Sequence, residues 1–158
     1  MVSLLTTCRS LVGHFNRSAC GYADLHTCQK NTGVSQLQLI QDVPTRWNSV
    51  YLMLDRLKNQ KKALRLYEIE FSLPGKALLT SNDWNKIAKL APILEQFHQF
   101  TLDMSKYNAH IGIVLPAVKS MIGALERNEN DAGVRTTKKA FLDEIHSRFK
   151  DYLNQGGK

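Results

Sequence analysis

The stretch LIQDVPTRWNSVYLMLDRL, residues 39–57, decides how the rest of the chain is arranged. Its apolar start leads into Pro44, which disfavours helix in the residue before it and so predicts an extended entry and a corner. Thr45 stands where a helix N-cap is expected, because its hydroxyl can accept a backbone N–H of the next turn. The apolar side chains that follow recur at helical spacing, at Trp47, Val50, Tyr51, Leu54 and Leu57. The stretch therefore predicts an extended segment, a corner and a helix that opens with Arg-Trp.

The same periodicity predicts helices along the rest of the chain. Residues 3–29 form a first helix with a break near Gly21, and Asn31-Thr32-Gly33 ends it. LQLIQ is expected to be extended rather than paired in a sheet. Further helices are predicted over residues 60–71, 111–125 and 134–149, and Pro116 is either a kink in the second of these or its start. Another helix is predicted to begin at the capping-box motif TSND at 80–83 and to run through Pro92. The fold class is therefore all-α, a bundle of about six helices with little or no strand.

Composition sets broad limits on the class of protein. The chain has 158 residues, 43% hydrophobic, which suffices for a single globular domain over 1–158, with 155–158 as a frayed tail. The formal charge of +7, from 21 Lys and Arg against 14 Asp and Glu, favours an acidic partner. Three Cys do not make a disulfide framework, which fits a reducing compartment. Neither a signal peptide nor a membrane span is predicted.

Several motifs together resemble one family. DVPTRWNSVYLMLDRL resembles the Arg-Trp segment of hAT superfamily transposases and of the BED-zinc-finger proteins domesticated from them. CRSLVGHFNRSA upstream, and LTSNDWNKIAKLAPILEQF and VRTTKKAF downstream, extend the resemblance over nearly the whole chain. Val50 departs from the family pattern, in which Thr is common. The resemblance implies a helical domain inserted into an RNase H-like core, cut from a longer transposase-like chain and nuclear in location.

Metal and catalytic chemistry find little support in the sequence. Cys8, His14, Cys20 and His26 recur every six residues, so successive side chains on a helix point about 120° apart, and adding Cys28 does not make a tetrahedral set. We therefore predict no metal site and no cofactor. Asp42 is the one acid after a strand-like run, and one acid cannot hold the two ions of an RNase H-like enzyme. We interpret Asp42 as an acceptor for backbone N–H groups at the corner, and we predict no catalytic residues.

Basic side chains gather around the Arg-Trp corner. Between residues 43 and 66, six Lys and Arg side chains stand against Asp55 alone. By resemblance, Trp47 stacks on an unpaired base, whereas the spacing of Trp47 alone fits a core residue, and both interpretations remain open. Arg46, beside it, is expected to contact a phosphate. The basic run is likewise either a DNA contact or a solvated helix face. The predicted DNA-binding set is Arg46, Trp47, Asn48, Arg56, Lys58, Lys61, Lys62 and Arg65.

Two functions follow from these observations. The first is DNA binding by a transposase-derived helical domain that has no catalysis of its own. The alternative is a protein-interaction or oligomerisation module of a domesticated nuclear regulator, which would self-associate or pack on the missing RNase H-like core. Steep salt dependence distinguishes DNA contacts from apolar association. No membrane partner is expected.

Overall fold

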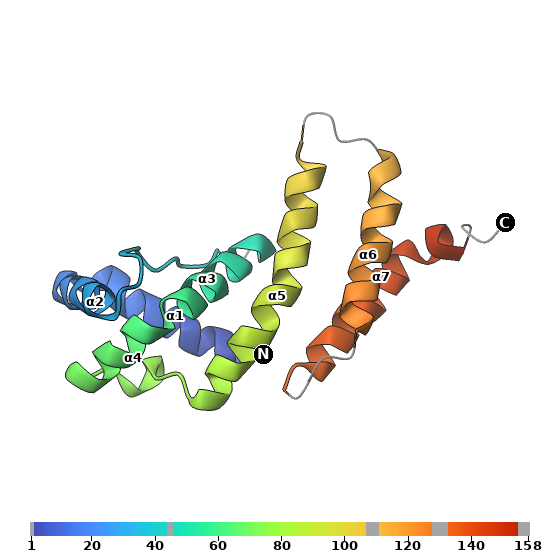
Figure 1. The fold of residues 1–158 in the computed structure, drawn as a ribbon. Coiled ribbons are helices and arrows are strands. Elements are labelled where there is room, and N and C mark those ends of the chain that lie inside the picture. Colours follow the sequence, from blue (N-terminus) through green and yellow to red (C-terminus); the bar gives the residue numbers. More distant parts are fainter. Residues whose placement is uncertain (1, 44–45, 107–110, 128–132, 155–158) are drawn as a thin grey trace. The chain divides into compact units, whose positions relative to one another are not determined.

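The first predicted helix is divided in two at Ser18 in the computed structural model, which describes residues 2–43, 46–106, 111–127 and 133–154 (Figure 1). Helix α1 spans Val2–Arg17 and α2 spans Ala19–Thr32. Ser18 has an extended backbone, and its hydroxyl oxygen accepts the Gly21 N–H at 3.0 Å. The sequence predicts the break near Gly21. The N-cap chemistry of Ser18 moves it three residues earlier and leaves Gly21 inside α2.

The end of α2 is the predicted glycine stop. Gly33 has φ 68° and ψ 20°, a left-handed conformation that costs glycine little. Its N–H donates to the Lys30 carbonyl at 3.2 Å, and the Val34 N–H donates to the Gln29 carbonyl at 3.1 Å, which satisfies the last carbonyls of the helix. Within the described residues, 34–43 then form no strand, as predicted for LQLIQ.

The Arg-Trp helix and its successor are separated by a single residue. Helix α3 spans Trp47–Asn59, and α4 spans Lys61–Glu70. Gln60 lies between them with φ −93° and ψ 5°, and its side chain is fully buried. The 3₁₀ helix η1, Gly75–Ala77, follows the predicted break after α4 and packs on α1.

Helix α5, Ser81–Met104, begins at the predicted capping box. The Thr80 N–H donates to Asp83 Oδ2 at 3.0 Å, and the Asp83 N–H donates to Thr80 Oγ1 at 3.2 Å. These reciprocal bonds satisfy two backbone donors that the first turn leaves without partners. The helix continues through Pro92.

Two further helices complete the described chain. The 3₁₀ helix η2, Ile111–Ile113, leads into α6, Val114–Glu126, and α7 spans Arg135–Asn154. Pro116 is the third residue of α6, where its backbone nitrogen needs no hydrogen bond within the helix. Pro116 therefore marks the start of the helix, which is one of the two alternatives that the sequence allows. The predicted frayed tail at 155–158 lies outside the described residues.

The chain divides into two compact units, Met1–Ala91 and Pro92–Lys158, and α5 contributes to both. In the first unit α2 packs on α4, and α1 packs on α2 and η1. Fully buried apolar side chains fill it, among them Phe15, Leu25, Met53 and Ile87. In the second unit α6 and α7 pack together around Val118, Met121, Leu125 and Ile145. The expectation of one domain over 1–158 stays a prediction.

The all-α class is confirmed. The described residues form seven α-helices and two 3₁₀ helices, and the seventh α-helix arises from the break at Ser18. No strand occurs in the described parts of the chain. Among those helices we also find none with the length and hydrophobicity to cross a bilayer.

Candidate nucleic-acid interface

The Arg-Trp corner is anchored to α1 by an ion pair. Arg9 Nε donates to Asp42 Oδ1 at 2.9 Å, and Arg9 Nη2 donates to Asp42 Oδ2 at 2.6 Å. The Asp42 side chain is 0% exposed and that of Arg9 is 37% exposed. The Arg9 guanidinium lowers the pKa of Asp42, which keeps the carboxylate ionised despite its burial. The sequence predicts backbone N–H partners for Asp42. Its side-chain partners among the described residues are a cation 33 residues away and Gln41 Nε2 at 3.1 Å, and the backbone at 44–45, which that prediction concerns, lies outside the description.

Ser49 closes the corner from inside α3. Its hydroxyl oxygen accepts the Val43 N–H at 2.8 Å. The hydroxyl proton has two acceptors in reach, the Arg46 carbonyl at 2.5 Å and the Val43 carbonyl at 2.9 Å. The Arg46 N–H donates back to the Val43 carbonyl at 2.8 Å. A side chain of the first turn therefore fixes the approach of the chain to the helix.

Arg46, not Thr45, is the N-cap of α3, and this corrects the prediction. Arg46 has an extended backbone, φ −125° and ψ 99°, and its side chain makes no cap hydrogen bond. The Ser49 hydroxyl bonds to the backbone of Val43 and Arg46 before the helix, whereas the Thr45 hydroxyl was expected to accept an N–H of the first helical turn. Pro44 and Thr45 lie outside the described residues. Helix α3 begins at Trp47, but the position of the Trp47 side chain is also outside the description, so neither interpretation of that residue is tested.

The extended segment before the corner is held by buried amides. Gln60 Nε2 donates to the Ser35 carbonyl at 2.9 Å, and Gln60 Oε1 accepts from Gln29 Nε2 at 2.9 Å. Gln29 Nε2 also reaches the Leu37 carbonyl at 2.8 Å. Both glutamine side chains are 1% exposed. Sequence reasoning missed this network, and its only local signal is a polar residue, Gln60, within a run of helix-forming residues.

The predicted basic residues fall into two groups. Arg46 at the start of α3, Lys58 near its end and Lys62 in α4 form an exposed group. The other three have partners within the unit, although Lys61 is exposed as well. Arg56 donates to the Gln38 carbonyl, and Lys61 Nζ lies 5.7 Å from the centre of the Trp84 ring. Arg65 pairs with Glu68 at 3.1 Å.

Asn48 is an uncharged member of the predicted DNA-binding set. It is half-buried in the first turn of α3, and its Oδ1 atom is buried without a hydrogen-bond partner in the described structure. A buried amide oxygen without a partner is costly, so Asn48 can gain a hydrogen bond from a ligand or a solvent molecule.

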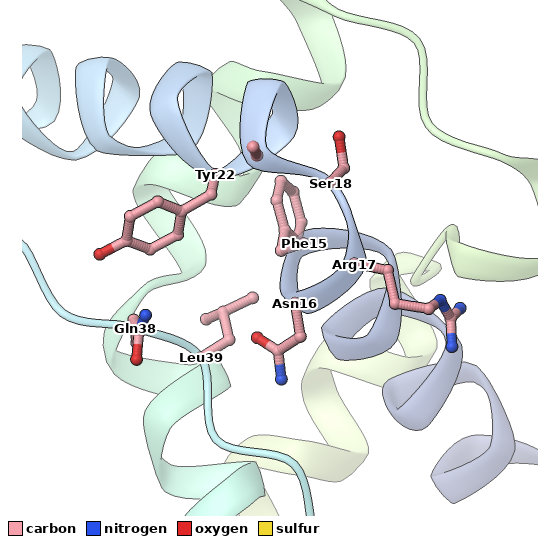
Figure 2. A pocket seen from close by; sticks show the side chains of 8 residues that line it. Phe15, Asn16, Arg17, Ser18, Tyr22, Gln38 and Leu39 are labelled. Atoms are coloured by element: carbon pink, nitrogen blue, oxygen red, sulfur yellow. The ribbon is translucent and has the colours of Figure 1, made fainter.

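A pocket of about 460 Å³ opens beside the extended segment (Figure 2). It lies where the junction of α1 and α2 meets the linker, and Phe15, Tyr22 and Leu39 supply apolar walls with Asn16 and Gln38. Figure 2 shows the Arg17 side chain extending away from Leu39 and Gln38. Neither a carboxylate nor an imidazole is among the described residues that line this pocket, so nothing there would activate its hydroxyl groups and we assign it no chemistry.

The cysteines are free thiols and two of them are deeply buried. Burial raises the pKa of Cys8 to about 12 and the pKa of Cys28 to about 11, which keeps both protonated at neutral pH. Cys20 is exposed. Within the described residues no three His, Cys, Asp or Glu side chains are grouped so that they could hold a metal ion.

Comparison with known proteins identifies the first unit. A family model described as the ZBED1 RNase-like helical domain matches residues 1–93. Human zinc finger BED domain-containing protein 4 is 26% identical over 153 residues, 96% of this chain and 13% of the relative. Human zinc finger BED domain-containing protein 6 is 27% identical over 136 residues, 84% of this chain and 13% of the relative.

A third relative is fungal. The protein tpeD of Talaromyces stipitatus, named as a transcriptional regulator, is 37% identical over 67 residues, 42% of this chain and 8% of the relative. No solved structure matches the chain. The chain spans 13% of the length of the two BED-type relatives. It belongs to the ZBED1 RNase-like helical domain family, the hAT-transposase-derived helical domain of BED-type zinc finger proteins that its Arg-Trp segment resembles.

Proposed function

We propose that this helical domain contributes DNA binding through its Arg-Trp corner, in a nuclear regulator of transposase descent. The observation that carries the proposal is the exposure of Arg46. It is exposed at the N-cap of α3 and makes no cap hydrogen bond there. The corner beneath it is fixed by the Arg9–Asp42 pair and by Ser49. Because the backbone of the corner is already fixed, only the Arg46 side chain has to be ordered when the guanidinium binds a phosphate.

The remaining exposed cations extend the contact along the helix pair. Lys58 lies twelve residues after Arg46, which is about 18 Å along a helix, or about five base pairs of duplex. Lys62 lies four residues after Lys58, at the start of α4. Arg56, Lys61 and Arg65 add positive potential, but each must give up or share an intramolecular contact to touch DNA.

We propose further that this chain does not itself cleave or join DNA. Asp42, the acid that follows the extended run, is occupied by the Arg9 guanidinium in a bidentate pair. A carboxylate bound in this way would have to leave its cation before it could coordinate Mg²⁺. The BED-type names of the relatives favour a regulator over an enzyme.

Substitutions at the corner test the DNA proposal. If Trp47 stacks on an unpaired base, Trp47→Ala should weaken binding to DNA with such a base by about 1–3 kcal/mol and should leave the melting temperature nearly unchanged. Binding to plain duplex should change much less, because paired bases offer no free face. Arg46→Ala should weaken binding to both DNAs alike and flatten the salt dependence. Fluorescence anisotropy at several salt concentrations measures all of these effects.

The opposite outcome is equally specific. If Trp47 is a core residue, Trp47→Ala should cost about 3–5 kcal/mol of stability. Loss of folding in Trp47→Ala, together with unchanged DNA binding in Arg46→Ala, would make the corner purely structural.

One observation favours the alternative function of protein association. Ile69 is 82% exposed on α4, on the side of the helix that carries Lys62 and Arg65. Isolated exposed apolar residues are common, so Ile69 supports this function less strongly than Arg46 supports DNA binding. Association through Ile69 would persist at high salt and would be lost in Ile69→Lys, whereas DNA binding weakens steeply as salt rises.

A further inference from the structure

A second pocket, of about 350 Å³, lies between α1 and the turn that contains η1. It belongs wholly to the first unit. Its polar walls come from Ser10, His14, Arg17 and Ser18 on one side and from Lys76 beside Pro74 on the other. The η1 turn is tied down, because Ala77 is 2% exposed and its N–H donates to the Pro74 carbonyl at 2.7 Å. Neither Asp nor Glu is among the described residues that line this pocket.

The Arg17 guanidinium lies over Gly13, one turn earlier in α1. A Cβ atom built on Gly13 would lie 3.1 Å from Arg17 Nη1 and 3.2 Å from Arg17 Nη2. The guanidinium is the end of a flexible, exposed side chain, so it would shift by only a few tenths of an ångström to admit an alanine there. Arg17 therefore supplies a permanent cation on the α1 side of the pocket.

Further polar side chains accompany the two cations. The Nε2 atom of His14 is buried and has no hydrogen-bond partner in the described structure, so an imidazole nitrogen remains to be satisfied. The Ser18 oxygen accepts the Gly21 N–H, which leaves the Ser18 hydroxyl proton to donate. Ser10 lines the pocket with a second hydroxyl. Two cations, two hydroxyls and an imidazole, without an opposing carboxylate, are typical of an anion site.

We propose that this pocket binds a dianionic phosphate group, either as free phosphate or as the phosphate of a monoester. The permanent charges of Arg17 and Lys76 together match a dianion, and a phosphate monoester carries a charge of about −1.5 to −2 at pH 7. A backbone phosphate diester carries one charge only, and DNA is contacted along a surface. A cavity of about 350 Å³ lies at the small end of the range of ligand pockets and holds a phosphate with a small attached group. The proposal does not depend on the DNA function of the Arg-Trp corner.

Calorimetric titration of the full chain at low salt tests the ligand class. The probes are inorganic phosphate, O-phosphoserine and dimethyl phosphate, a monoanionic diester. We expect saturable one-to-one binding of inorganic phosphate, with dimethyl phosphate at least about tenfold weaker. Binding of phosphoserine as well would identify the natural source as a phosphate carried on a larger molecule, whereas binding of inorganic phosphate alone would identify free phosphate. Equal binding of the diester, or no saturable binding, would overturn the proposal.

Variants assign the binding to this pocket. Arg17→Gln and Lys76→Gln should each weaken phosphate binding about tenfold, and neither side chain is buried, so both variants should fold. Lys30→Gln, at an exposed lysine near the end of α2 and outside the pocket lining, is the matched control and should leave phosphate binding unchanged. Loss of duplex DNA binding in Arg17→Gln with phosphate binding intact would make the pocket part of the DNA surface instead.

Discussion

At the scale of single residues, Arg9 and Asp42 form one ion pair but differ in how far water reaches each side chain. Asp42 is fully buried, whereas the Arg9 side chain is 37% exposed. Loss of Asp42 leaves a cation that water can still reach. Loss of Arg9 leaves an ionised carboxylate that water cannot reach, which is the more costly defect. The two halves of one ion pair therefore differ in their importance for stability.

We predict that Arg9→Met destabilises the chain by about 3–5 kcal/mol and Asp42→Asn by about 1–3 kcal/mol, measured by urea denaturation at pH 7. Asp103→Asn, at a surface pair with Lys106, is the matched control and should change little. Similar costs for Arg9→Met and Asp42→Asn would show that the corner relaxes to admit water.

The same pair predicts a dependence on pH. Arg9 lowers the pKa of Asp42 in the folded state, so the pair stabilises the fold at pH values above the unfolded pKa of the carboxyl. This stabilisation is lost as the pH falls through the folded pKa. The stability difference between the natural chain and Arg9→Met should therefore shrink as the pH is lowered from 7 towards 3. A difference that stays constant would mean that Asp42 does not titrate with folding.

At the scale of elements, local patterns predicted the helices well and their junctions poorly. The period of the apolar residues predicted α3 to α7, because each helix buries one stripe. Gly33 and the capping box at Thr80 were also predictable, since both act within four residues. The break was predicted near Gly21 but occurs at Ser18, because both residues can interrupt a helix and Ser18 also caps the next one. The Arg9–Asp42 and Gln29–Gln60 contacts join residues more than thirty positions apart, and no local pattern reports such a pairing.

The junction of α3 and α4 provides the prediction at this scale. Gln60→Ala removes the partner of the Ser35 carbonyl and of the Gln29 amide, so we expect a loss of about 2–4 kcal/mol in stability. Hydrogen exchange in residues 34–41 should also accelerate, because Gln60 ties that segment to the helices. Gln36→Ala, at an exposed glutamine of the same segment, should change stability by less than about 0.5 kcal/mol. Equal effects of the two substitutions would contradict this role of Gln60.

At the scale of the whole molecule, the family match and the division of the chain agree. The family model ends at residue 93, and the first compact unit ends at Ala91. Pro92 begins the second unit inside α5, where it removes one backbone hydrogen bond of the helix. Each unit has its own apolar core, so the chain has the elements of two cooperative folding units despite the continuous helix that joins them.

The two cores predict two unfolding transitions. Both tryptophans, Trp47 and Trp84, belong to the first unit, so tryptophan fluorescence follows that unit, whereas far-ultraviolet circular dichroism follows both. Phe15→Ala should cost about 3–5 kcal/mol and lower the fluorescence midpoint. Leu125→Ala should cost about 2–5 kcal/mol and should lower the unfolding midpoint of the second unit only. That transition is seen in the dichroism signal but not in the fluorescence signal. If both variants instead shift one shared transition in both signals, residues 1–158 fold as the single domain that the sequence predicts.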